Sequence, residues 1–120
     1  EYVLTERRTV FPKAAQVAPA GSTSLYVCPA GKRAKILSFT LDVGANSLAT
    51  LTVQSDFLAY LLVPVGGIGH ADQTFGYENG IDLSSGQSVV LTNDPGSTTS
   101  ATGVIIVVEE SAGGGYFTPS

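Results

Sequence analysis

The sequence predicts an all-β protein: a single antiparallel β-sandwich, jelly-roll-like, with extended N- and C-terminal arms. Short segments rich in Val, Thr, Leu, Ile and aromatic residues are separated at close intervals by turn signals such as Gly44-Ala-Asn46 and Ser85-Gly86. No window shows apolar residues at the 3.6-residue spacing of an amphipathic helix. The 120 residues suffice for one domain with its own core, which we place at residues 21–110.

The first half of the chain contains four expected strands. Residues 8–17 include Pro12, which has no backbone donor, so we expect an edge strand or an arm within residues 1–20. A second strand, 24–28, ends at Cys28, which has no partner for a disulfide and is expected to be a buried thiol. Apolar and polar residues alternate over 34–43 and 48–54, which predicts strands with one face toward a core. In 34–43 the expected inward residues are Leu37, Phe39, Leu41 and Val43.

The second half contains the remaining expected strands, at 57–63, 73–78, 88–92 and 102–109. Residues 88–92 alternate in the same way as the earlier strands. Asn79-Gly80 follows the strand at 73–78 and suits a tight turn, because both residues tolerate a positive φ angle.

Two of these segments do not alternate: residues 57–63 and 104–108 are apolar at nearly every position. Only 13% of the residues are charged, about half the usual share. A chain so poor in charge cannot easily cover its own surface with polar groups, which indicates that other protein covers part of it. The sequence therefore favours an assembly subunit over an enzyme. The expected interface residues in the two runs are Leu58, Tyr60, Leu62, Ile105 and Val107.

Both ends of the chain carry aromatic or aliphatic residues, and their composition differs from that of the strands between them. In the tail, residues 111–120, three glycines precede Tyr116 and Phe117. We interpret this tail as a flexible docking arm, because aromatic anchors carry much of the energy of interfaces. Tyr2 and Leu4 could serve likewise. The alternative is a frayed end whose aromatic residues fold back on the domain.

Composition and motifs argue against several functions. The net charge of −4 argues against nucleic acid as a partner, since phosphate binding needs clustered Lys and Arg. No apolar stretch is long enough to cross a membrane, and the start shows no secretory signal. His70, the only histidine, lies in a glycine-rich segment expected to be an exposed loop, without a nucleophile motif. No metal or cofactor motif appears, so we expect no cofactor and no catalytic residues.

Carbohydrate binding is the alternative from another class. Tyr60, Phe75 and Tyr77 together with Asp82 could form a platform for stacking a sugar. The chain has no tryptophan, the preferred residue for such stacking, which weakens this interpretation.

Two turn-and-strand motifs carry a resemblance to a known group of proteins. The stretch Tyr26-Val-Cys-Pro-Ala-Gly-Lys32, followed by an alternating apolar strand, resembles a pattern of small tailed-bacteriophage virion proteins. Ile81-Asp-Leu-Ser-Ser-Gly-Gln-Ser-Val-Val-Leu91 resembles their second marker, and the similarity covers roughly residues 22–110.

The resemblance implies a non-enzymatic virion subunit, made in the host cytoplasm and placed on the particle exterior. It implies a capsid decoration or cement protein, with a head- or tail-fibre adaptor as the alternative. The implied partners are further copies of the chain, as a homotrimer, and the major capsid protein or another virion protein.

Overall fold

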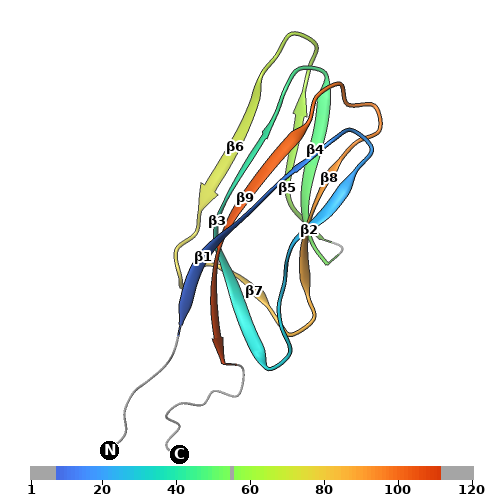
Figure 1. Ribbon diagram of the computed structural model, residues 1–120. Coiled ribbons are helices and arrows are strands. Elements are labelled where there is room, and N and C mark those ends of the chain that lie inside the picture. The colour runs from blue at the N-terminus through green and yellow to red at the C-terminus, as the bar shows by residue number, and fades with distance from the viewer. Residues whose placement is uncertain (1–7, 55, 112–120) are drawn as a thin grey trace, which may run out of the picture.

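The computed structural model describes residues 8–54 and 56–111, which fold into two facing antiparallel sheets without a helix (Figure 1). It therefore also contains, over these residues, no helix long and apolar enough to cross a membrane. Nine strands are described in this part of the chain. They are β1 (Thr9–Val17), β2 (Ser22–Val27), β3 (Lys32–Val43), β4 (Ser47–Val53), β5 (Asp56–Val63), β6 (Gly69–Thr74), β7 (Ile81–Leu83), β8 (Ser88–Asn93) and β9 (Ala101–Ser111).

The strand pairs are nested within one another. One sheet has the order β1-β9-β3-β6, with β7 also paired to β3, and the other has the order β2-β8-β4-β5. The first strand thus pairs with the last, β2 with β8, and β4 with the β5 that follows it. The β-sandwich predicted from the turn spacing is confirmed. β5 forms one edge of its sheet, and β1, an edge strand as the proline suggested, forms an edge of the other.

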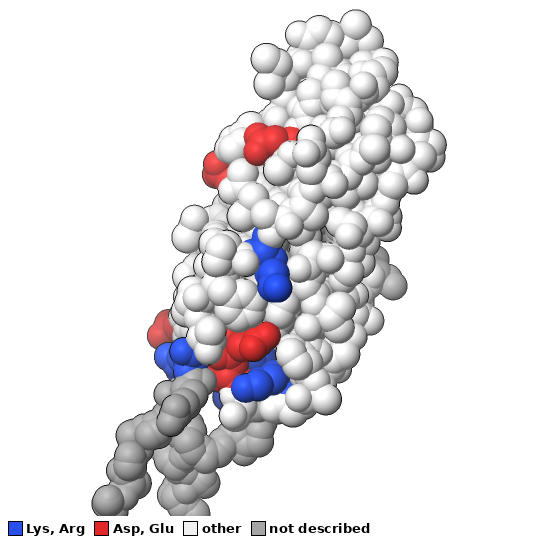
Figure 2. All heavy atoms as spheres, viewed as in Figure 1, with Lys and Arg blue, Asp and Glu red and all other residues white. Residues whose placement is uncertain are grey.

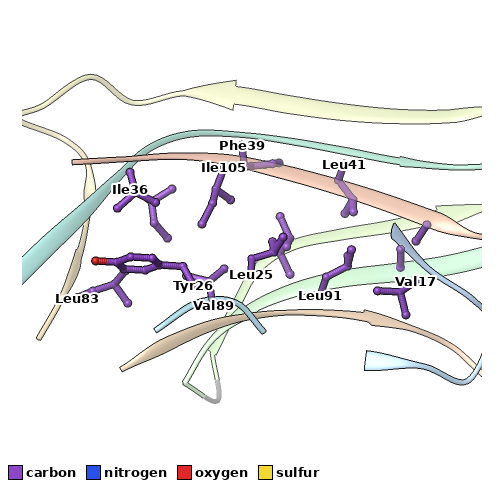
Figure 3. Packing of buried hydrophobic residues seen from close by; sticks show 14 of the residues in the cluster. Val17, Leu25, Tyr26, Ile36, Phe39, Leu41, Leu83, Val89, Leu91 and Ile105 are labelled. Atoms are coloured by element: carbon purple, nitrogen blue, oxygen red, sulfur yellow. The ribbon is translucent and has the colours of Figure 1, made fainter. Parts of the chain in front are cut away.

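The hydrophobic core fills the space between the two sheets. Ile36, Leu41 and Ile105 point from one sheet toward Val89 and Leu91 of the other, and all five are fully buried (Figure 3). Alternation produces this arrangement, because successive side chains of a strand point to opposite faces. Cys28 is also buried, as predicted, and burial raises the pKa of its thiol.

A bulge in β3 changes which residues face the core. The register with β9 shifts between Ile36 and Ser38, so Leu37 is an extra residue in its strand. Ile36 therefore points inward, and Leu37, predicted to do so, is only half-buried. Phe39, Leu41 and Val43 are buried as predicted.

The segment between β5 and β8 departs most from the sequence-based expectation. The strand expected at 73–78 lies at Gly69–Thr74, and β7 was not predicted at all. His70 is consequently a strand residue rather than a loop residue. Positive φ is found at Gly76 (77°) and not at the Asn79-Gly80 pair, so the turn is made earlier than its sequence suggested.

A buried polar network fixes the loop between β8 and β9 to its neighbours. The Asn93 side chain has no exposed surface, and its Nδ2 donates to the carbonyl oxygens of Val17 (3.0 Å) and Thr99 (2.8 Å). Ser47 Oγ lies 3.0 Å from Thr99 Oγ1, and the Ser97 hydroxyl donates to the Leu48 carbonyl oxygen. These bonds hold the end of the sandwich that also carries the loop after β5.

Candidate assembly surface

Large apolar side chains are exposed along β5 and the loop that follows it. Five of them form what we call the β5 patch. They are Phe57 (67% exposed), Tyr60 (58%), Leu62 (64%), Val65 (82%) and Ile68 (93%). Single exposed apolar residues are normal on a protein surface, but five within twelve consecutive residues (57–68) are a concentration typical of interaction surfaces.

A second bulge brings Phe57 into this patch. Leu51 pairs with Ala59 and Thr52 with Phe57, so Leu58 is the extra residue in β5. The bulge places Phe57 on the same outer face as Tyr60 although three positions separate them. Their rings meet edge to face, with centroids 6.1 Å apart. Period-two reasoning missed Phe57, because no residue type in β5 marks the position of a bulge.

The three interface residues predicted in β5 differ in their exposure. Tyr60 and Leu62 are exposed, as a contact surface requires. Leu58 is half-buried and packs against the core, because the bulge turns it inward. That part of the prediction is corrected, and contact of Tyr60 and Leu62 with a neighbour stays a prediction.

The prediction that Ile105 and Val107 face outward is wrong. Both side chains have no exposed surface, because β9 runs between β1 and β3 and its odd-numbered residues here point into the core. Gly103 continues the same face, and a Cβ there would lie 3.2 Å from a methyl carbon of Leu91. Val104 and Ile106 occupy the outer face instead and are half-buried.

Charged side chains gather at the end of the sandwich opposite the loop after β5. Figure 2 shows most of them where β1 begins and β9 ends, with a smaller acidic group nearer the other end, whose tip is uncharged in this view. Because charged groups are depleted at the centres of protein interfaces, the charge distribution favours the β5 end as the contact surface. The positions of the charged residues along the sequence did not predict that they gather at one end of the sandwich.

Glu110 is the centre of the charged end. Its nearly buried carboxylate accepts hydrogen bonds from Arg8 (3.1 Å), Arg33 (2.7 Å) and the Tyr77 hydroxyl (3.0 Å). Burial alone would raise the pKa of the Glu110 carboxyl, but these three donors outweigh it and hold the pKa below its ordinary value. The Arg8 guanidinium also lies 4.3 Å from the Tyr77 ring centre. The cluster links β9 to β3, to the residue before β1 and to the segment between β6 and β7, and so stabilises this end of the fold.

A pocket of about 440 Å³ lies beside this cluster. Tyr77 and Asp82 both line it, with Arg33 and Lys35. Phe75 instead packs against Phe39, with ring centroids 6.1 Å apart, and Tyr60 belongs to the β5 patch on the other sheet. The four residues of the suggested sugar platform therefore do not come together.

His70 lies between two carboxylates on the outer face of its sheet. Its Nδ1 is 2.5 Å from Asp42 Oδ1, across the strand pair, and its Nε2 is 2.7 Å from Asp72 Oδ2. The hydrogen bonds to Asp42 and then to Asp72 raise the pKa of the imidazole. Among residues 8–54 and 56–111, no group of three or more His, Cys, Asp or Glu side chains is arranged to hold a metal ion.

The remaining predicted interface residues belong to the two ends of the chain. Tyr2, Leu4, Tyr116 and Phe117 lie outside the described residues. Their role as arms stays a prediction.

Comparison with known proteins shows similarity at the level of the fold. No protein-family model matches the chain, and no curated protein matches its sequence. The acid-stable capsid structure of Helicobacter pylori bacteriophage KHP30 matches with a TM-score of 0.57 and 14% identity, covering 88% of this chain and 93% of that one. A chain of the extra small virus particle of the freshwater prawn Macrobrachium rosenbergii matches with a TM-score of 0.51 and 9% identity, covering 89% and 80%. At identities this low, the likeness shows a shared fold.

Proposed function

We propose that the chain is a non-enzymatic structural subunit of a virus particle that attaches to neighbouring protein through the β5 patch. The observation that carries this proposal is the row of exposed Phe57, Tyr60 and Leu62 side chains on a strand at the edge of its sheet. The two matched structures, one from a phage capsid and one from a virus-like particle, support a virion setting.

The strand order supports a jelly-roll assignment within the β-sandwich class. In a jelly roll, two Greek keys fold together so that strands early in the chain pair with strands late in it. The nested pairs β1–β9, β2–β8, β3–β6 and β4–β5 have this arrangement. Viral capsid proteins are one of the groups that use it.

The size of the β5 patch is in the range that protein association needs. At roughly 200 Å² for a fully exposed large side chain, its five residues expose about 700 Å². Burying that area contributes roughly 17 kcal/mol at about 25 cal/mol per Å². Association costs an estimated 4–15 kcal/mol, which is of the same order, so the patch is large enough to contribute to a contact but its area does not set the affinity.

In its specific form, the proposal is a capsid decoration or cement protein on the particle exterior. The sandwich, which includes β1, would sit on the shell as a homotrimer, with the segment before β1 and the tail after β9 lying across neighbouring subunits. Contacts to several shell proteins resist outward force, because linked contacts must break together. A head- or tail-fibre adaptor would use the same patch and is the second candidate.

Purified particles test this proposal. Particles are banded on a density gradient, and the amount of this chain is measured by mass spectrometry relative to the shell protein. A decoration protein is expected at a fixed ratio near one copy per shell subunit, whereas a fibre adaptor is expected at a few copies per particle. Absence of the chain from intact particles would contradict the virion role.

A further inference from the structure

Beyond its bulge at Leu58, β5 lacks the features that protect the other sheet edges from pairing with another chain. Edge strands are usually guarded by prolines, charges, bulges or short length. β1 carries Pro12 and Lys13, and β6 carries charged residues such as Asp72. β2 has only six residues and an irregular register at Leu25. β5 has eight residues, and the one charge among them is at its first position, Asp56.

The part of β5 after its bulge is regular. From Ala59 to Val63 each residue pairs in order with β4, ending at the Ser47–Val63 pair. Outward Tyr60 and Leu62 alternate there with inward-facing Ala59, Leu61 and Val63. A regular, uncharged run of five residues with one free side is a template for a further strand.

We propose that β5 pairs antiparallel with β5 of a second copy, around a two-fold axis at Leu61. This register uses the whole regular run and keeps like faces together, because residues directly opposite each other share a face. Tyr60 then lies opposite Leu62 of the partner subunit, and Ala59 lies opposite the partner's Val63. The two four-stranded sheets become one continuous sheet.

The charges of β5 suit a second copy as the occupant. In this register the two Asp56 carboxylates lie at opposite ends of the paired strands, so no like charges face each other. Side chains on the outer face stand perpendicular to the sheet, so edge pairing covers part of the β5 patch, where Tyr60 packs beside the partner's Leu62. A two-fold contact presents the same surface from both subunits, which a self-complementary strand satisfies.

The inference rests on the proposed function and names the partner of the β5 patch. The two-fold contact would join copies in neighbouring trimers, because a three-fold contact uses other surfaces.

Disulfide trapping in the full chain tests the register. In Leu61→Cys the two thiols face each other across the axis, with Cα atoms about 4.5–5.5 Å apart, which is within disulfide range. Thr50→Cys on β4 is the control, because its counterpart would be three strand spacings away, about 14 Å. Native Cys28 is buried and does not compete. After mild oxidation, we expect a covalent dimer as the main product of Leu61→Cys and monomer from Thr50→Cys.

A second pair of variants tests the same β5–β5 register and leaves the core residues unchanged. Tyr60→Cys and Leu62→Cys alter exposed side chains, so both should fold. Mixed, they should cross-link at least fivefold more than either variant alone, because each is opposite the other position and not itself. Equal cross-linking alone and mixed, or no cross-link in any sample, would overturn the inference. Particle binding is measured separately: variants that bind particles without cross-linking overturn the strand pairing and leave the virion role standing.

Discussion

Leu62→Lys should weaken assembly strongly and stability slightly. Leu62 is 64% exposed in the isolated chain, so the fold buries only about a third of it. Full burial of a leucine is worth roughly 1.5–3 kcal/mol, which puts its contribution to folding below about 1 kcal/mol. The remaining two thirds is worth about 1–2 kcal/mol per copy in an interface. A two-fold contact at the strand edge covers part of this surface on both copies, so the substitution should weaken binding by up to roughly 100-fold in the dissociation constant.

The assay compares two measurements on the same samples. Sedimentation velocity over a concentration series gives the dissociation constant, and thermal unfolding followed by circular dichroism gives the stability. Ile105→Lys is the contrasting variant, because it places a charge in the core and should prevent folding. An unchanged dissociation constant for a folded Leu62→Lys protein would refute the reasoning, as would a folded Ile105→Lys protein.

Four further predictions concern other parts of the molecule. Asn93→Ala removes the donor to two buried carbonyl oxygens and should lower the free energy of unfolding by about 1–3 kcal/mol in urea titrations, with Thr92→Ala close to neutral. Because the folded pKa of Glu110 is lowered, its contribution to stability is present above pH 4.5 and is lost as the pH falls through the folded value. Glu110→Gln should remove that acid dependence from melting curves. The raised pKa of His70 has the opposite sign: its contribution is complete below pH 6.5 and is lost as the pH rises through the folded value, a dependence that His70→Gln should abolish. Deletion of residues 113–120 should leave the melting temperature nearly unchanged but weaken attachment to particles; equal attachment of the truncated chain would remove the tail from the account.

Turn chemistry and alternation predicted the fold class and most of the strands. Gly44-Ala-Asn46 ends β3 where expected, and Asn46 has a positive φ of 54°. Alternation placed Phe39, Leu41 and Val43 in the core correctly. These features are local, so the sequence specifies them without knowledge of the neighbouring strands.

Bulges and strand parity account for most of the differences at the candidate site. An extra residue at Leu37 or Leu58 reverses the facing of everything on one side of it, and either neighbour could have been the extra residue by composition alone. In β9 both faces are apolar, so the sequence could not say that Ile105, rather than Ile106, points into the core. Only the pairing of β9 with β3 decides this.

Strand β6 was placed wrongly, at 73–78, for a different reason. β6 contains His70, Asp72 and Gln73, and its polar side chains lie on an exposed edge where little apolar burial is required. The Glu110 cluster was missed because its donors come from segments far apart in sequence.

Hydrogen–deuterium exchange of β5 in assembled particles tests the central claim most directly. Peptides covering residues 57–63 are compared between the free chain, diluted below its dissociation constant so that it is monomeric, and the chain on particles, with β3 peptides as the internal reference. If a neighbour covers and pairs with β5, its amides should exchange at least tenfold more slowly on the particle while β3 is unchanged. Equal exchange of β5 in both states would contradict the claim that this strand is the assembly surface.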